Sequence, residues 1–169
     1  MINHSKAALL LFVVVLLLSA CSASLTEEQT AAKDEVGESF KIDPKATNNE
    51  NEDIKFYLPF GFEVNKETPN NIILKNGSKT YILFYNPHEG PESKVIYEAA
   101  LKQKEYDFKE TFSTKDGHFG YLLIKNADNQ LNELTIGVGG VKITTQSKTK
   151  NLSAEAVNMA EIIQSVKMR

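Results

Sequence analysis

Hydrophobic and polar residues alternate along much of the second half of the chain, and this period of two predicts β-strands. Residue pairs that favour tight turns interrupt the alternation at Asn76-Gly77, Asp116-Gly117 and Gly139-Gly140. Such pairs tolerate the positive φ angles that short hairpin loops need. We therefore expect three β-hairpins, joining 71–75 to 79–85, 109–114 to 118–125, and 131–138 to 141–147.

The hairpin at Gly139-Gly140 also predicts a register. A two-residue loop places Val138 opposite Val141, Ile136 opposite Ile143, and Leu134 opposite Thr145 on one mostly apolar face. The other face then carries Glu133, Thr135, Lys142 and Thr144. This pattern is typical of an antiparallel sheet with one buried side.

Two segments have helical signals. The first begins at Gly90-Pro91, where proline suits the first helical position, and runs to about Lys104. The second has Ser153 as its expected N-cap and Leu152 against Val157 as a hydrophobic staple. Its apolar residues recur at helical spacing, at Ala156, Met159, Ala160, Ile163 and Val166.

The order of these elements predicts the fold class of residues 54–169. Strands, a helix, further strands and a final helix indicate an α+β domain, an antiparallel meander of about seven or eight strands in hairpins packed by two helices. This part of the chain holds every aromatic residue except Phe12 and Phe40, so we expect the hydrophobic core there.

The N-terminus has the pattern of an export signal. Lys6 precedes an unbroken apolar run from Ala7 to Leu18. This run is shorter than the roughly 20 apolar residues of a membrane-spanning helix and fits the roughly 7 to 15 of a signal-peptide core. Residues 1–20 are therefore predicted to be a lipoprotein signal peptide.

The single cysteine supports the lipoprotein form of this signal. The run ends in Leu18-Ser19-Ala20-Cys21, which resembles the lipobox of bacterial lipoproteins. That resemblance implies a diacylglyceryl lipid on the Cys21 thiol, cleavage just before Cys21, and no other cofactor. The alternative is an ordinary secretory signal with an incidental cysteine. Without a second cysteine no internal disulfide can form, which favours the lipobox.

Residues 21–53 are predicted to be an acidic, flexible tether between the lipid and the domain. Residues 22–53 carry nine acidic and three basic residues, and large apolar residues are few. So little apolar surface does not offset the entropy of ordering. The alternative is a short amphipathic helix over Thr26 to Phe40, because only Gly37 interrupts that stretch.

Residues 54–169 resemble a known class of domains. The segment from Ile54 to Phe62, the hairpins after it and the closing segment from Ala160 to Val166 are similar to small extracytoplasmic domains of Gram-positive lipoproteins of unknown function. These are broadly similar to the Mog1/PsbP-like fold, in which helices pack an antiparallel sheet. Phe62 stands where that fold often has Trp. The resemblance implies a non-catalytic binding or assembly module and transfers no active-site residue.

Composition and motifs point away from several classes of activity. A net charge of −3 excludes a generally basic nucleic-acid binder. His88 and His118 are 30 residues apart and in no metal-binding pattern, and no serine lies in a Gly-x-Ser-x-Gly motif. We therefore expect no metal site, no catalytic residue and no enzyme activity.

The expected function follows from location. The sequence predicts a lipid-anchored protein on the outer face of the cell membrane that binds an envelope protein, a wall component or a small ligand. Basic residues are almost all lysine, with Arg169 the exception, as is typical of AT-rich Gram-positive genomes. The alternatives are a membrane-surface hydrolase and an envelope stress sensor acting through protein contacts. The candidate contact loop comprises Pro87, His88, Glu89, Gly90 and Pro91.

Overall fold

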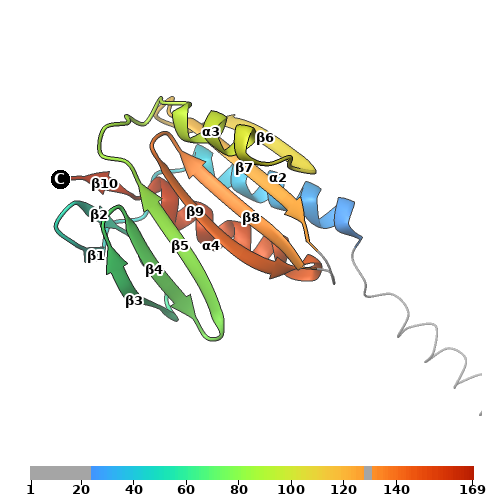
Figure 1. Ribbon diagram of the computed structural model, residues 1–169, viewed down its shortest axis with the longest axis horizontal. Coiled ribbons are helices and arrows are strands. Elements are labelled where there is room, and N and C mark those ends of the chain that lie inside the picture. The colour runs from blue at the N-terminus through green and yellow to red at the C-terminus, as the bar shows by residue number, and fades with distance from the viewer. Residues whose placement is uncertain (1–23, 128–130) are drawn as a thin grey trace, which may run out of the picture.

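Seven antiparallel strands form the central sheet of the protein (Figure 1). The structure is a computed structural model that describes residues 24–127 and 131–169. The sheet order is β3-β4-β5-β9-β8-β7-β6, so two meanders meet where β5 pairs with β9. The strands are β3 (Phe62–Thr68), β4 (Asn71–Asn76), β5 (Lys79–Tyr85), β6 (Phe108–Ser113), β7 (Phe119–Asn126), β8 (Leu131–Val138) and β9 (Val141–Lys148).

A second, small sheet lies at one end of the molecule (Figure 1). It has the order β1-β2-β10 and consists of β1 (Asn49–Glu50), β2 (Ile54–Phe56) and β10 (Lys167–Met168). The Arg169 amide donates a hydrogen bond to the Asp53 carbonyl oxygen at 2.9 Å, which extends the pairing of β10 with β2. The small sheet therefore joins the C-terminal segment to residues 49–56.

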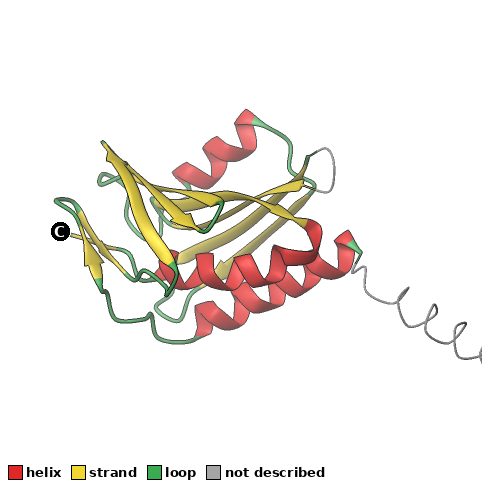
Figure 2. Cartoon of the chain, turned by 90° about the horizontal axis from the view of Figure 1, so that it is seen from below, coloured by secondary structure: helices red, strands yellow, loops and turns green. Residues whose placement is uncertain are grey.

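Three helices flank the central sheet in the described part of the chain. Figure 2 shows two long helices side by side on one face and a shorter helix on the opposite face. The pair comprises α2 (Leu25–Lys41) and α4 (Leu152–Gln164), with the short helix η1 (Thr149–Asn151) leading into α4. The shorter helix is α3 (Val95–Gln103), which lies in the connection between the two meanders.

The structure confirms the α+β class and the predicted hairpins. Val138 pairs with Val141, Ile136 with Ile143, and Leu134 with Thr145. The glycine of each predicted turn has a positive φ angle, which side chains other than glycine adopt less readily. The loop of the first hairpin is shifted by one residue to Gly77-Ser78, because Asn76 pairs with Lys79.

The outer face of the sheet is more buried than predicted. On β7, Leu122 and Ile124 face α2 and α4, whereas Tyr121 and Leu123 join a second apolar cluster with Ala100 of α3. Because α3 covers this part of the sheet, β7 is apolar on both sides rather than alternating.

Both predicted helix starts differ from those in the structure. The first helix begins at Val95, because the residues after Pro91 form turns before it. The second begins at Leu152, one residue before its predicted N-cap, and Asn151 provides no side-chain cap. Ser153 lies inside the first turn and bonds instead to a carboxylate of α2, that of Glu28.

The predicted flexible tether is wrong for the part of it that the structure describes. Residues 25–41 form α2, and Ala32, Val36 and Phe40 are fully buried in the main core. These side chains are few, but their spacing of four residues places them on one helix face, so each is buried completely. The alternative of a helix over this segment is confirmed, and residues 25–41 pack with residues 54–169 in one core.

The N-terminus of α2 is closed by a capping box. The Glu27 amide donates to the Ser24 hydroxyl at 3.2 Å, and the Ser24 amide donates to the Glu27 carboxylate at 2.8 Å. These bonds to Ser24 lower the pKa of the Glu27 carboxyl. The predicted signal peptide, Cys21 and the lipobox lie outside the described residues.

Candidate functional site

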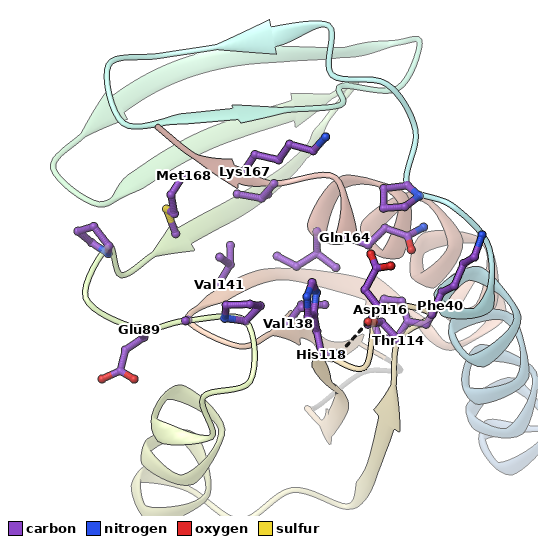
Figure 3. Close-up of a pocket in the computed structure, with 18 of the residues that line it drawn as sticks. Phe40, Glu89, Thr114, Asp116, His118, Val138, Val141, Gln164, Lys167 and Met168 are labelled. Carbon is purple, nitrogen blue, oxygen red and sulfur yellow. Dashed lines mark hydrogen bonds between the residues drawn. The ribbon is translucent and has the colours of Figure 1, made fainter.

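An apolar hollow beside the predicted contact loop lies where α2 and α4 end (Figure 3). It has a volume of about 450 Å³, within the range of about 300 to 1,000 Å³ that ligand pockets occupy. Five stretches of sequence line it: the ends of α2 and α4 with the residues after them, the loop from Pro87 to Pro91, and the β6–β7 and β8–β9 turns. We call this hollow the terminal cavity.

The inner surface of the terminal cavity is apolar. Phe40, Val138, Val141 and Ile163 line it and are buried, so the core itself forms its floor. At the rim, two large apolar side chains are exposed to solvent, Ile42 at 55% and Met168 at 39%. Exposed apolar groups around an apolar hollow would be removed from water if a ligand occupied it.

Two glycines of the β8–β9 turn hold the predicted contact loop in place. The Asn86 amide donates to the Gly140 carbonyl oxygen at 2.9 Å. A Cβ atom on Gly140 would lie 2.5 Å from the Glu89 carbonyl oxygen, and one on Gly139 would lie 2.4 Å from that of Gly90. Only glycine allows this close approach of two backbones. The paired glycines therefore support one wall of the cavity.

The β6–β7 turn forms the opposite wall and is tied to the end of α2. Within the turn, the Thr114 amide donates to the His118 carbonyl oxygen at 3.0 Å, and the His118 amide donates to the Thr114 hydroxyl at 3.1 Å. The Lys115 amide donates to the Phe40 carbonyl oxygen at 2.7 Å, and its ammonium group pairs with Asp43. Backbone bonds thus fix the turn beside the last residues of the helix.

Polar groups lie on one side of the cavity and apolar groups on the other. Figure 3 shows the Asp116 carboxylate beside the Gln164 amide, while Val141 and Met168 lie across the cavity from them. The Gln164 amide nitrogen donates to the Ser39 hydroxyl at 3.2 Å, so its carbonyl oxygen remains as an acceptor. The Glu89 carboxylate points away and accepts a bond from Ser93.

All five residues of the predicted contact loop line the terminal cavity. His118, which the sequence presented only as an isolated histidine, lines it with His88. Among residues 24–127 and 131–169, no cluster of three or more His, Cys, Asp or Glu side chains could hold a metal ion. The cavity therefore offers shape, apolar surface and hydrogen-bonding groups.

Sequence reasoning missed most of the cavity. Ile42 falls within the predicted tether, Val138 and Val141 fall on the apolar face of a predicted hairpin, and no prediction concerns Met168. No local pattern relates these positions, because the cavity depends on how distant segments pack. The one sequence feature that could have indicated the cavity wall is Gly139-Gly140, since paired glycines indicate close backbone approach as well as a turn.

A buried polar cluster lies apart from the cavity, between β5 and α4. The Glu155 carboxylate accepts bonds from the Lys79 ammonium group and from the Tyr81 hydroxyl, the latter at 2.5 Å. Burial raises the pKa of the Tyr81 hydroxyl, and the neighbouring Glu155 charge raises it further. Since each polar group has a partner, this cluster joins α4 to the sheet rather than presenting a reactive group.

The chain matches no known protein family, no curated protein and no solved structure. The similarity to Mog1/PsbP-like domains of lipoproteins thus stays a prediction. None of the helices within the described residues combines the length and the apolar character needed to cross a membrane.

Proposed function

We propose that this protein is a lipid-anchored, extracytoplasmic binding module of the bacterial cell envelope that carries out no catalysis itself. A lipid on Cys21 attaches it to the outer face of the membrane, and the terminal cavity takes its ligand. The signal-peptide pattern and lipobox support the anchor. The observation that carries the binding role is the cavity of about 450 Å³ with an apolar floor and polar groups along one side.

The position of α2 supports this arrangement. Only two residues separate Cys21 from Ser24, the N-cap of α2, so an anchor at Cys21 holds the start of the helix close to the bilayer. The helix has 17 residues and spans about 25 Å at 1.5 Å per residue. The cavity begins at Phe40, near the other end of α2. In this proposal α2 is a rigid spacer that presents the cavity away from the membrane.

The anchor is tested in cells that express the full chain. The Cys21→Ala variant should lose labelling by a radioactive fatty acid and appear in the medium. A Ser19→Thr variant, which leaves the cysteine in place, serves as the processing control. Continued labelling of Cys21→Ala, or its unchanged membrane fractionation, would reject the anchor.

The cavity is tested on residues 22–169, which contain every element of the core. N-phenyl-1-naphthylamine, a neutral apolar dye, should fluoresce more strongly on binding. Ile42→Glu should weaken this binding at least 10-fold, since it places a charge at the cavity rim. Val95→Glu is the matched control, because Val95 is similarly exposed, at 51%, but lies on α3 outside the cavity lining. Equal binding by both variants would overturn the role of the cavity.

A further inference from the structure

Strand β10 lies at an edge of the small sheet and borders the terminal cavity. It pairs with β2 on one side, through Lys167 with Lys55 and Met168 with Ile54. Both β10 residues line the cavity. Figure 3 shows them along one wall, with the Met168 side chain directed into the hollow. An edge strand beside an apolar hollow is the arrangement that proteins use to bind extended peptides.

The pairing of β10 determines which backbone groups remain available. In an antiparallel pair, successive residues alternately direct both backbone groups toward the partner strand and away from it. The Arg169 amide donates to the Asp53 carbonyl oxygen at 2.9 Å, which marks residue 169 as directed toward β2. Lys167 is two residues earlier in the strand, so its backbone groups are also directed toward β2. Met168 between them therefore directs its N–H and C=O away from β2.

The hydrogen bonds between β2 and β1 lead independently to the same alternation of backbone directions. The Asn51 amide of the β1 side donates to the Ile54 carbonyl oxygen at 3.0 Å, so Ile54 directs its groups toward β1. Its neighbour Lys55 must then direct its groups toward β10, where it meets Lys167. In the part of the chain that the structure describes, no backbone hydrogen bond joins Met168 to a segment outside the small sheet. The N–H and C=O groups of Met168 are thus an available donor and acceptor beside the cavity.

We propose that the terminal cavity binds an extended peptide segment, which pairs with the backbone of Met168 as an added strand and inserts one large apolar side chain between Val138, Val141 and Ile163. This deepens the proposed function and rests on it, because it names the ligand class of the same cavity. A peptide uses both features at once, the paired N–H and C=O of Met168 and the apolar floor. A small amphipathic molecule would use the floor alone.

The polar side of the cavity is suited to the rest of such a peptide. The Asp116 carboxylate and the Gln164 carbonyl oxygen are acceptors near the polar wall, and a peptide supplies N–H donors along its length. Pro87 and Pro91 limit the conformational freedom of the loop that forms one wall of the cavity. Less entropy is then lost when a peptide lies against that wall.

The test uses residues 22–169 immobilised and screened against a random heptapeptide library. The expected result is a set of binders that share one large apolar residue. N-methylation of the peptide at a single backbone nitrogen, the one that pairs with Met168, should abolish binding, whereas N-methylation elsewhere should matter much less. A library that yields no binder, or binders insensitive to N-methylation at every position, overturns the peptide proposal.

Two variants of the protein separate the backbone contact from the side chain. Met168→Ala and Met168→Pro both remove the thioether, but only proline removes the N–H, and an edge strand tolerates it. Met168→Pro should bind the selected peptide roughly 3- to 10-fold more weakly than Met168→Ala, as expected for one lost hydrogen bond. Equal affinities would show that the Met168 N–H is not used and would reject strand pairing.

Binding of the naphthylamine dye distinguishes failure of the peptide proposal from failure of the proposed binding function. If the dye binds and Ile42→Glu blocks it while no peptide is selected, the cavity is a binding site for small apolar molecules and the peptide proposal fails alone. If neither dye nor peptide binds the folded protein, the binding role of the cavity fails with it.

Discussion

The Glu28 carboxylate on α2 accepts two hydrogen bonds from Ser153 at the start of α4, one from its amide nitrogen at 3.2 Å and one from its hydroxyl at 3.1 Å. It thus takes the role that the N-cap of α4 does not fill, because Asn151 makes no capping bond. A carboxylate also interacts favourably with the positive end of a helix dipole. One helix therefore caps the other, and the two begin side by side.

Glu28→Ala should lower the free energy of unfolding by about 1 kcal/mol, the usual loss when a helix cap is removed. Urea denaturation of residues 22–169 measures this change. Glu35→Ala is the control, since Glu35 is an exposed acidic residue of the same helix. Similar stabilities of the two variants would show that the Glu28 carboxylate does not cap α4.

Removal of α2 should prevent folding of the remaining chain. A fragment of residues 54–169 would expose the core surface that Ala32, Val36 and Phe40 cover, and loss of even one large buried side chain costs about 3 to 5 kcal/mol. Circular dichroism of the fragment should lack a cooperative thermal transition, whereas residues 22–169 should have one. A fragment that melts cooperatively would show that the domain folds without α2 and would contradict its role in the core.

Gly140→Ala should displace the loop from Pro87 to Pro91 and destabilise the protein by about 1 to 3 kcal/mol, because the added Cβ would overlap the Glu89 carbonyl oxygen. Binding of the naphthylamine dye should weaken in parallel. Gly90→Ala is the matched control, since a Cβ there meets no atom within 4 Å. If the two variants behave alike, the close approach at Gly140 is not what positions the loop.

Two tyrosines provide a matched test of buried hydroxyls. The Tyr121 hydroxyl is buried with no hydrogen-bond partner among the described residues, so Tyr121→Phe should leave the free energy of unfolding unchanged or raise it by about 1 kcal/mol. Tyr81→Phe should lower it by about 1.5 to 3 kcal/mol, because the Tyr81 hydroxyl bonds a charged carboxylate. Chemical denaturation of both variants gives the comparison, and the reverse order of stability would contradict it.

Stability should decline above pH 10. Burial raises the pKa of four tyrosine hydroxyls above the value of about 10 in unfolded chains, at Tyr81, Tyr85, Tyr106 and Tyr121. Above pH 10 the unfolded chain loses these protons first, so the folded state becomes relatively less stable as the pH rises. The stabilisation is fully present below pH 10.

Burial of Lys142 affects stability in the opposite direction. Its burial lowers the pKa of its ammonium group, so stability from this group rises with pH up to about 10.5. Urea denaturation at several values between pH 8 and pH 11 should still show a net decline in the free energy of unfolding, since four tyrosines oppose one lysine. The free energy of unfolding of Tyr121→Phe should decline less steeply with pH than that of the unaltered protein. Identical slopes would reject the contribution of Tyr121.

The sequence by itself determined the hairpins, the register of β8 with β9, and the α+β class. These features depend on residues close to one another in the chain: a glycine turn such as Gly139-Gly140 and the alternation on either side of it specify which residues face each other. The signal-peptide pattern is equally local. The apolar stripe of α4 was recognisable because its residues recur within one short segment.

Only the tertiary structure decided that α2 belongs to the core and that a cavity exists. Few apolar residues predicted a tether, yet Ala32, Val36 and Phe40 are buried because α4 and the sheet lie against them. The same holds for Ser153, whose partner Glu28 is distant in sequence, and for the edge of β10, which is defined by its pairing with β2. The reason is physical: burial and hydrogen bonding depend on the neighbours that folding supplies, and distant neighbours leave no local pattern.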